Sequence, residues 1–396
     1  MRILLVGDYP DDPRLGSGKV YHKLREELAA LGHECDVLLA PDLGPRPANA
    51  RLRWLVGPVL AERAVRRAFR ERGAYDVIDA ASAEGEMIGI RRRTGSYRGV
   101  ALVSRSHGLE HLNYRRMLED ADAGLASKPW YRRLWYPAAR MSQVAMAARL
   151  ADRLIVLNPG DRDFALGRGW LPSNRVDVVP HGVSARFLDD APPPDAPRGR
   201  GILFCGSWDA VKGVDTLVRA MSLLQSAGDA PPLTILGPGL PADAVLAAFP
   251  AEVRPRVTVI PRAPEDEVMR RYREHDALVV PSTYEGFGMV IVEAMSQRLP
   301  VVSTPVGCAP SLVRDGETGL LTPPRDAEAL AAAIRRMTGD GDARRWMGDA
   351  AREAVRGMSW TATARRTIEV YEAALATSGK RVAGMQEKRA GGYRSE

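Results

Sequence analysis

The sequence predicts an α/β protein built from two doubly wound domains, each a parallel sheet with helices on both faces. The chain has 396 residues, 45% of them apolar, which is long enough for two domains. Apolar runs of about four to six residues alternate with amphipathic segments of about 10 to 15, the pattern of parallel strands and crossover helices. A proline-rich stretch, DDAPPPDAPRGR from Asp189, interrupts the alternation and predicts a stiff, extended connector.

Five apolar runs are the expected strands of each half. In the first half they begin at residues 2, 35, 75, 100 and 153 and read RILLVG, CDVLLA, YDVIDA, VALVSR and RLIVLN. In the second half they begin at residues 201, 233, 257, 277 and 300 and read GILFCG, LTILG, VTVI, ALVVPS and PVVST. Ligands of such sheets collect at the carboxyl ends of the strands, so the expected site is a cleft between the two halves.

The segment from Leu60 to Gly73, LAERAVRRAFRERG, predicts an amphipathic helix. Its leucine, alanines, valine and phenylalanine share one face, and its arginines occupy the other. We expect this helix to lie on its own sheet with a solvated arginine face, and a role at a membrane surface or in acceptor binding stays open as an alternative.

The excess positive charge lies entirely in the first half of the chain. The formal net charge is +7, and residues 1–185 hold 29 basic and 22 acidic side chains whereas residues 186–396 hold 27 of each. This distribution favours an anionic partner, such as a phosphorylated acceptor or an acidic membrane surface. The stretches RLRWLVGP from Arg51 and KPWYRRLWY from Lys128 mix basic with aromatic residues, which favours peripheral membrane contact. Without a recognition motif beside them, we expect no nucleic-acid partner.

Cysteine usage and hydropathy indicate a cytoplasmic protein. Cys35, Cys205 and Cys308 are odd in number and widely spaced, which favours reduced thiols. The apolar run at the N-terminus is too short for a signal-peptide core, and no stretch reaches the roughly 20 apolar residues that span a bilayer. We therefore expect a cytoplasmic location, peripheral to the membrane if it contacts one.

The stretch LGSGKVY, Leu15 to Tyr21, resembles the end of a Walker motif but lacks its spacing. A P-loop requires a glycine five residues before Gly18 and a hydroxyl residue after Lys19, and here these positions hold Pro13 and Val20. What remains is a glycine-rich loop between a strand ending at Gly7 and a helix expected from Ser17 to Leu31.

The stretch PSTYEGFGMVIVEAM, from Pro281, has the strongest chemical signal. A strand is expected to end at Ser282, a loop carries Glu285, and a helix is expected to begin near Gly286. Because glycine is a poor helix former, Gly286 and Gly288 require a reason. Either they form a flexible turn, or they let a diphosphate approach the unpaired amides at the positive end of the helix. Glu293 lies eight residues beyond Glu285, about 12 Å along a helix, roughly the span of a diphosphate with a sugar at each end.

This Glu-x7-Glu pattern within EGFG…EAM closely resembles the donor site of retaining family 4 glycosyltransferases of the GT-B fold. The resemblance continues through VVSTPVGCAPSLVRDGETGLL from Val301 and ILFCGSWDAVKGVDTLVRAM from Ile202, and more thinly through SHG at Ser106 and VVPHGV at Val178. It covers most of residues 1–375 and is strongest from about 200 to 335. It implies two Rossmann-like domains facing a central cleft, with a C-terminal helix crossing back to the first domain.

The resemblance implies a role for each candidate residue. The loop of Gly16, Ser17 and Gly18 would help to enclose the donor, a nucleoside diphosphate sugar of the UDP or GDP type. His107 would lie beside the transferred sugar, and Glu285 would contact that sugar. The remaining donor-binding residues would bind diphosphate, sugar and, through Glu293, ribose; they are Gly206, Ser207, Lys212, Gly286, Phe287, Gly288, Met289 and Glu293. Such a site needs no metal or other cofactor.

Three positions depart from the family pattern. Ser207 stands where an arginine is common, which removes one cation that would face phosphate. Arg298 stands where a small residue is usual, and because a left-handed backbone costs a non-glycine residue on the order of 1 kcal/mol, we expect an altered turn there. His181 replaces a common asparagine.

The sequence therefore predicts a retaining, metal-independent glycosyltransferase acting on a lipid-linked, phosphorylated or small-molecule acceptor. We expect an acceptor domain at residues 1–188, a donor domain at 198–358, a crossing helix at 359–376 and a flexible tail at 377–396. Two alternatives stay open. The chain could be a GT-B-like epimerase or phosphorylase, or it could be a non-catalytic basic binding module with a degenerate donor pocket.

Overall fold

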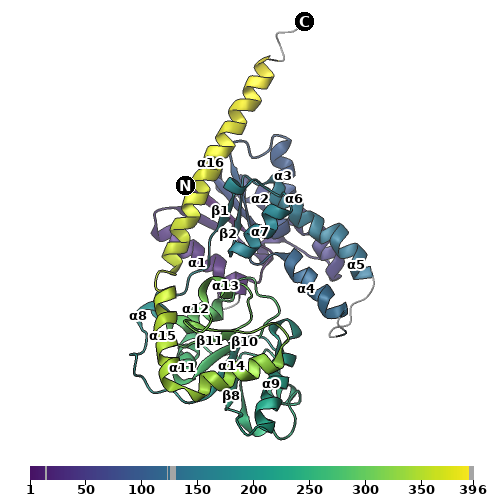
Figure 1. Ribbon diagram of the computed structural model, residues 1–396. Helices are drawn as coiled ribbons and strands as arrows, with labels where there is room; N and C mark the ends of the chain where they lie inside the picture. Colours follow the sequence, from purple (N-terminus) through teal and green to yellow (C-terminus); the bar gives the residue numbers. More distant parts are fainter. Residues whose placement is uncertain (14–15, 123, 125–130, 392–396) are drawn as a thin grey trace. The chain divides into compact units, whose positions relative to one another are not determined.

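The computed structural model describes residues 1–13, 16–122, 124 and 131–391 (Figure 1). It divides into two compact units: the N-terminal unit is Met1–Pro180 with Trp360–Glu396, and the C-terminal unit is His181–Ser359. Each unit is built on a six-stranded sheet in which all the strands are parallel. The predicted α/β architecture of two doubly wound domains is confirmed.

The sheet of the N-terminal unit has the strand order β2-β1-β3-β4-β5-β6. The order reverses between β1 and β3. Five strands were expected from the sequence, and β6 was missed because Asp177 interrupts its apolar run. The strands are β1 (Arg2–Val6), β2 (Glu34–Leu38), β3 (Val77–Ala81), β4 (Ala101–Arg105), β5 (Arg153–Val156) and β6 (Val176–Val178).

Helices and short helical turns connect these strands. The α-helices are α1 (Gly16–Ala30), α2 (Ala50–Arg72), α3 (Gly85–Arg93), α4 (Glu110–Asp122), α5 (Tyr131–Tyr136), α6 (Ser142–Leu150), α7 (Pro159–Gly167) and α16 (Trp360–Gly391). Shorter helical turns are η1 (Ala40–Leu43), η2 (Ser82–Glu84), η3 (Pro137–Met141) and η4 (Ser173–Arg175).

Helix α2 confirms the expected amphipathic helix and extends it by ten residues toward the N-terminus. Ala61, Ala64, Val65 and Ala68 are buried in a core shared with β1 and β3, whereas the arginines of the same segment are exposed. Asn49 caps the helix, since its side chain accepts hydrogen bonds from the amides of Arg51 and Leu52. The expected solvation of the arginine face therefore holds for the part of the helix that lies on the sheet.

The C-terminal helix α16 belongs to the N-terminal unit and lies alongside α1 (Figure 1). Tyr371 donates a hydrogen bond of 2.6 Å to Asp79 on β3, and Arg105 on β4 pairs with the same carboxylate. Both charged side chains are fully buried, so α16 closes over an internal ion pair. The helix continues to Gly391, where the sequence predicted a tail from residue 377, because no proline interrupts the chain there; residues 392–396 lie outside the described residues.

The sheet of the C-terminal unit has the order β12-β11-β10-β7-β8-β9. Its reversal, between β7 and β10, places it among the doubly wound sheets that include the dinucleotide-binding folds. The strands are β7 (Ile202–Cys205), β8 (Leu233–Leu236), β9 (Val257–Ile260), β10 (Ala277–Val280), β11 (Val301–Ser303) and β12 (Gly319–Leu321), the last of which was not predicted.

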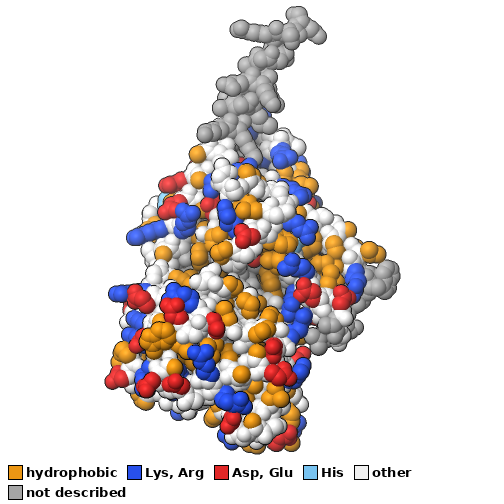
Figure 2. All heavy atoms as spheres, viewed as in Figure 1, with side chains coloured by type: hydrophobic (Ala, Val, Ile, Leu, Met, Phe, Trp, Pro, Cys, Tyr) orange, Lys and Arg blue, Asp and Glu red, His pale blue; other side chains and the backbone are white. Residues whose placement is uncertain are grey.

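The helices of this unit enclose a large apolar core that includes Leu217, Met221, Leu330 and Ile334. Acidic and basic side chains are interspersed over the face of this unit seen in Figure 2. The α-helices are α8 (Ala185–Asp189), α9 (Val214–Ser226), α10 (Ala242–Leu246), α11 (Glu265–Glu274), α12 (Met289–Ser296), α13 (Ala309–Leu312), α14 (Ala327–Gly339) and α15 (Gly341–Val355), with shorter turns η5 (Ala210–Lys212) and η6 (Arg254–Arg256).

The proline-rich connector is part of the C-terminal unit, so the boundary between the units lies at Pro180 and not at residue 188 as expected. Side chains of the unit hold the chain here: Gln297 donates to the Phe187 carbonyl in α8, just before the connector, at 2.6 Å, and Arg298 donates to the Pro192 carbonyl of the connector at 3.0 Å. At its far end Arg198 donates to the carbonyls of Tyr272 and Gln297, both at 2.7 Å. These bonds, more than proline stiffness, fix the path of the connector.

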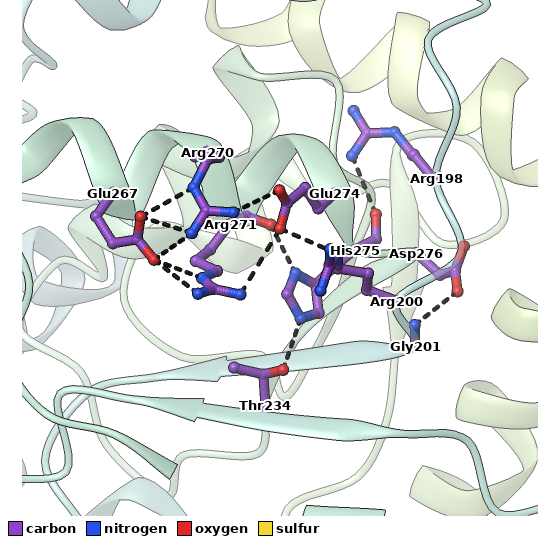
Figure 3. A network of polar contacts seen from close by, with 10 residues as sticks. All are labelled: Arg198, Arg200, Gly201, Thr234, Glu267, Arg270, Arg271, Glu274, His275 and Asp276. Atoms are coloured by element: carbon purple, nitrogen blue, oxygen red, sulfur yellow. Dashed lines mark hydrogen bonds and ion pairs between the residues drawn. The ribbon is translucent and has the colours of Figure 1, made fainter. Parts of the chain in front are cut away.

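The end of α11 shows how this unit buries a histidine (Figure 3). The ring nitrogens of His275 bond the Arg271 carbonyl at 2.7 Å and the Thr234 hydroxyl at 2.8 Å, and the side chain is fully buried. Burial lowers the pKa of His275 below its usual value. The neutral ring is therefore a structural link between α11 and β8.

The turn at Arg298 differs from our expectation. Arg298 has φ +56°, so the left-handed turn is kept despite the side chain. The amide of Arg298 donates to the Met295 carbonyl and that of Leu299 to the Ala294 carbonyl, which is the Schellman arrangement that ends many helices. Ion pairing with Asp349 and the bond to the connector hold the arginine in this conformation.

Candidate functional site

In the C-terminal unit, the candidate residues follow the two strands at which the order of the sheet reverses. The loop after β7 carries Gly206, Ser207 and Lys212, and the loop after β10 carries Glu285. Strands β7 and β10 are neighbours, so these loops emerge side by side at the carboxyl edge of the sheet. This is the position at which doubly wound sheets bind ligands.

Gly213 fixes the loop that carries Lys212. It has φ +71°, and a Cβ atom on it would lie 1.9 Å from the Pro281 carbonyl oxygen, so only glycine fits. A second tie lies beside it, since the Thr283 amide donates to the Val211 carbonyl at 2.8 Å. The backbone after β7 is thereby fastened to the end of β10, and Lys212 is held beside the loop of Glu285.

Lys212 and Glu285 form a tight ion pair. The Nζ atom of Lys212 lies 2.8 and 2.9 Å from the two carboxylate oxygens of Glu285, and the Ser282 hydroxyl donates to Oε1 of the same carboxylate at 2.7 Å. The side chain of Glu285 is 9% exposed and that of Lys212 is 29% exposed. The structure therefore brings together the predicted phosphate-binding cation and the predicted sugar-binding carboxylate.

Helix α12 begins at Met289, three residues later than expected, because Gly288 has φ +88° and serves as its N-cap. Glycine has no side chain to cap the first amides, and of these the Ile291 amide bonds the Gly288 carbonyl at 2.9 Å. The Phe287 side chain is buried against His181, with ring centroids 5.3 Å apart. Only the backbone of Phe287 is therefore suited to a ligand. The later helix start also means that Glu285 and Glu293 do not share one helix.

Glu293 lies in the second turn of α12 and is 9% exposed. Its Oε2 atom accepts a hydrogen bond of 3.3 Å from the Tyr272 hydroxyl, which also lies 3.7 Å from the Cys205 sulfur at the end of β7. Burial raises the pKa of the Cys205 thiol to about 12, with Glu293 adding to the shift and Lys212 opposing it. Cys205 is thus a neutral thiol within electrostatic range of both parts of the candidate site.

Gly206 and Ser207 lie in the same loop, before the lysine turn. Gly206 has φ +147°, which favours glycine, and a Cβ atom on it would lie 4.0 Å from the Cε atom of Lys212. Ser207 donates a hydrogen bond of 2.5 Å to Asp209, whose other oxygen accepts from the amides of Val211 and Lys212. Ser207 therefore supports the capping aspartate of the lysine turn.

The glycine loop of the N-terminal unit is explained partly by packing. Gly18 is buried, and a Cβ atom on it would lie 2.6 Å from the Pro10 carbonyl oxygen, so this glycine permits the loop after β1 to pack on α1. Gly16 is exposed with φ +33°, and Leu15 lies outside the described residues. Ser17 hydrogen-bonds with the hydroxyl of the partly buried Tyr9. Of the three predicted donor-binding residues in this loop, Gly16 is exposed, Ser17 is partly exposed and Gly18 is buried.

His107 follows β4 and packs against two tyrosines. Its ring centroid lies 5.2 Å from that of Tyr9 and 5.3 Å from that of Tyr21. Tyr9 thus contacts both His107 and Ser17, so the structure brings these two predicted site residues together. Burial, reinforced by Glu84 and Glu110, raises the pKa of Tyr9 well above its usual value, so its hydroxyl keeps its proton.

A charged cluster beside them was missed by sequence reasoning. Arg140 donates to both carboxylate oxygens of Glu110 at 2.9 Å and lies 3.5 Å from Glu84, while Ser82 donates to Glu110 at 2.5 Å. Burial raises the pKa of Glu84 to about 7. Ser82 has φ +45°, an uncommon conformation that aims the chain into this cluster. The only signal in the sequence was the position of Ser82 and Glu84 directly after an expected strand.

Among the described residues, no three histidine, cysteine, aspartate or glutamate side chains are grouped so as to hold a metal ion. All three cysteines are free thiols. Within the same part of the chain, no helix has the length and apolar content needed to cross a bilayer.

Comparison with known proteins adds two family matches. The model for "Glycosyltransferase Family 4" matches residues 16–187, and the model for "Glycosyl transferases group 1" matches residues 199–340. The first match covers most of the continuous part of the N-terminal unit, and the second lies within the C-terminal unit.

Relatives of known activity cover much of the chain. A D-inositol 3-phosphate glycosyltransferase of Nocardia farcinica is 32% identical over 70% of this chain, which spans 62% of that protein's length. An MMP alpha-(1->4)-mannosyltransferase of Mycolicibacterium hassiacum is 27% identical, with 95% of this chain and 99% of that protein covered.

Solved structures share the fold. Sucrose-phosphate synthase from Thermosynechococcus elongatus superimposes with a TM-score of 0.74 at 24% identity, covering 95% of this chain and 99% of that one. Anabaena HepE, solved with UDP-glucose, has a TM-score of 0.66 at 16% identity, with 93% and 98% covered. The molecule is thus a two-domain α/β protein of the GT-B class. Together with this fold, the two family matches support the glycosyltransferase assignment that the sequence motifs predicted, a family 4 domain followed by a group 1 domain.

Proposed function

We propose that the chain transfers a glycosyl group from a nucleoside diphosphate sugar to a hydroxyl acceptor, with retention of the anomeric configuration. The observation that carries the proposal is the Lys212–Glu285 pair, seated by Gly213 at the strand reversal and next to the glycine-capped start of α12. A cation and a helix N-terminus together stabilise the negative charge that grows on a departing diphosphate.

The ion pair has a defined part in this proposal. Before the donor binds, Glu285 neutralises Lys212, which would otherwise be a half-buried charge. When a diphosphate binds, Lys212 exchanges its carboxylate partner for phosphate oxygens, and the released Glu285 accepts hydrogen bonds from hydroxyls of the donor sugar. The tyrosine-held Glu293 binds the ribose. These protein groups supply the charge stabilisation without a metal ion.

The donor class draws support from the solved complexes. HepE was crystallised with UDP and with UDP-glucose, and its fold matches this chain over nearly its whole length. We infer a UDP- or GDP-sugar as the donor here. Because Ser207 stands where the family has an arginine, Lys212 must supply more of the positive charge that faces the diphosphate.

The acceptor binds, on this proposal, at the carboxyl edge of the N-terminal sheet, near His107 and the Arg140 cluster. The relatives named for D-inositol 3-phosphate favour a phosphorylated acceptor. Arg140, however, is already paired with two glutamates, which favours an uncharged, hydroxyl-rich acceptor. Both kinds of acceptor, and lipid-linked sugars, are therefore included in the test.

The test begins with a panel of UDP-, GDP-, ADP- and TDP-sugars, measured by thermal stabilisation and by slow hydrolysis of the donor. We expect one donor to stabilise and turn over, and Lys212→Ala to lower kcat/KM by about 10²–10³-fold. Glu293→Ala should abolish the stabilisation. Lys23→Ala is the matched control, since Lys23 pairs on the surface with Glu26 and should change neither readout.

Acceptors are then compared with that donor: inositol, inositol phosphate, hexose phosphates and polyprenyl-linked sugars. NMR of the product's anomeric proton distinguishes retention from inversion. If no nucleotide sugar stabilises the protein, the proposal fails, and the basic surface of the N-terminal half becomes the better guide to function. Formation of a free epimerised donor would instead identify an epimerase.

A further inference from the structure

The two basic and aromatic stretches noted in the sequence meet on one surface of the N-terminal unit. Trp54 on α2 stacks against Trp135 on α5, with ring centroids 6.2 Å apart and planes inclined by 26°. Tyr136 meets the edge of Trp54 at 5.2 Å and also packs on Tyr114 of α4. Residues about 80 apart in sequence thus form one aromatic cluster. In Figure 1, α5 lies at the outer side of this unit.

Three leucines that lie within two residues of these rings in the sequence are exposed to solvent. Leu52 is 52% exposed, Leu55 is 40% exposed and Leu134 is 68% exposed. They account for three of the eight large apolar side chains that are exposed among the described residues. The aromatic rings themselves are only half-buried. We call this set the Trp54 surface: Leu52, Trp54, Leu55, Leu134, Trp135 and Tyr136.

The charges around the Trp54 surface are mostly positive. Arg51 and Arg53 are exposed in the first turn of α2, a place where a helix favours acidic residues, and that turn contains none. In the sequence, residues 43–61 contain three arginines and residues 123–151 contain five basic residues, and neither segment contains an acidic one. Of these basic residues, Lys128 lies outside the described residues, and Arg46, Arg133 and Arg140 are paired with Asp8, Asp122 and Glu110. Acidic side chains of the neighbouring α4 are paired, Asp122 with Arg133 and Glu119 with Arg116.

We propose that the Trp54 surface binds the headgroup region of an anionic lipid bilayer. Tryptophan and tyrosine rings with an apolar body and a polar tip are the side chains that favour the membrane interface, and exposed leucines insert among acyl chains. Arginines at the rim attract anionic headgroups. The mixture of leucines, rings and arginines fits this partner better than a nucleic acid, which would leave the leucines uncovered. The proposal is independent of the transferase activity.

The test uses the full-length protein and co-sedimentation with vesicles of phosphatidylcholine containing about 30% phosphatidylglycerol. We expect binding that weakens as salt is raised from about 0.05 to 0.5 M, and little binding to phosphatidylcholine alone. Arg51→Ala with Arg53→Ala should lower the partition coefficient about 10- to 30-fold. Leu52→Glu with Leu134→Glu should lower it at least as much, because the new carboxylates are repelled by the lipid.

Two control variants lie on the C-terminal unit. Leu240→Glu changes a leucine of similar exposure, and Arg219→Ala with Arg256→Ala removes two arginines remote in sequence from the Trp54 surface; neither should affect binding. Circular dichroism establishes that all variants are folded. Absence of binding, or binding that the Trp54-surface variants leave unchanged, overturns the proposal. So does a dimer in light scattering that Leu134→Glu converts to a monomer, since the surface would then cover a second copy. Donor hydrolysis in solution is expected to be equal in all these proteins.

Discussion

The two units hold their candidate residues by different means. In the C-terminal unit the backbone does it: Gly213 lies against the Pro281 carbonyl, and the Thr283 amide bonds Val211. In the N-terminal unit buried charges do it, through Arg140 with its two glutamates and Arg105 with Asp79. Contacts between backbones tolerate only glycine, whereas charge pairs tolerate several residue types provided that both partners are present. The loops of the C-terminal unit are therefore fixed by the steric fit between backbones. The ion pairs of the N-terminal unit depend instead on the protonation state of their carboxyl groups.

The largest effect on stability is expected at Asp79, where a substitution tests whether buried charge pairs hold the N-terminal unit together. Asp79→Ala leaves Arg105 as an uncompensated charge that is fully buried, and we expect a loss of about 3–5 kcal/mol in the free energy of unfolding. Thermal and urea unfolding followed by circular dichroism measure it. Glu34→Ala, which removes the partner of Arg2 on the surface, is the control and should cost less than about 1 kcal/mol.

A double variant sharpens this result. Asp79→Leu with Arg105→Met removes both charges at once and should recover most of the lost stability, because no unpaired charge is then buried. Equal instability of the single and double variants would show that packing around α16, and not charge, controls the N-terminal unit.

The corresponding test in the C-terminal unit is the substitution Gly213→Ala. The added methyl would meet the Pro281 carbonyl at 1.9 Å, so we expect a loss of about 2–4 kcal/mol together with loss of donor binding. Gly228→Ala is the matched control, since Gly228 also has a positive φ of +79° but nothing lies within 4 Å of its Cβ position. The control measures the cost of φ alone, about 1 kcal/mol. Similar losses in both variants would contradict the close-contact argument.

The dependence on protonation can be tested at Glu84. Burial raises its pKa to about 7, so the folded chain holds a proton that the unfolded chain releases above pH 4.5. The stability from this group is full below about pH 4.5 and is lost as pH rises through 7. Relative to Glu84→Gln, the wild type should therefore lose about 2–3 kcal/mol between pH 4.5 and 8. Urea unfolding at several pH values measures the difference.

Glu34→Gln, at a side chain 77% exposed, should show no such dependence. A constant difference between wild type and Glu84→Gln across this pH range would mean that Arg140 keeps Glu84 ionised in the folded protein.

The smallest effect is expected at Arg298, where the C-terminal unit uses a non-glycine residue in a left-handed turn. Arg298→Gly relieves about 1 kcal/mol of backbone strain but loses the contacts with Asp349 and the connector, so the net change should stay within about 1 kcal/mol. Differential scanning calorimetry is suited to so small a shift. A loss above about 2 kcal/mol would show that the bond to the Pro192 carbonyl is a principal anchor of the connector.

This difference between the two units also explains which site residues could be predicted from the sequence. Glycines at Gly206, Gly213 and Gly288 lie close to the chemical residues they serve, so a local pattern marked the donor side. Glu84 and Arg140 are far apart in the chain, and no local pattern joins them. Tertiary pairing of that kind arises only when the sheet is assembled. Gly18 shows the same limit, because its close packing against the Pro10 carbonyl arises in the folded chain and has no local pattern in the sequence.

Element boundaries show the same limits. Long amphipathic helices and strands within uninterrupted apolar runs were recognised, the three-residue strand β11 among them. Strands β6 and β12 read VDV and GLL, so neither gives the apolar run of four that marked most of the other strands. The start of α12 was placed early because Gly286 and Gly288 look alike in sequence, and only the positive φ of Gly288 decides where the helix begins. The end of α12 carries Arg298 in the left-handed position where glycine is usual. A search for glycine would therefore not have found this helix end.

The ion pair beneath α16 has a practical consequence for dividing the molecule. The N-terminal unit is not a continuous segment, since Tyr371 and Thr367 complete the enclosure of Asp79 and Arg105. A fragment ending at Pro180 would open two charged side chains to water and strip apolar contacts from α1. Split-protein complementation, with residues 1–180 and a helical peptide supplied as separate chains, is the way to obtain this unit alone.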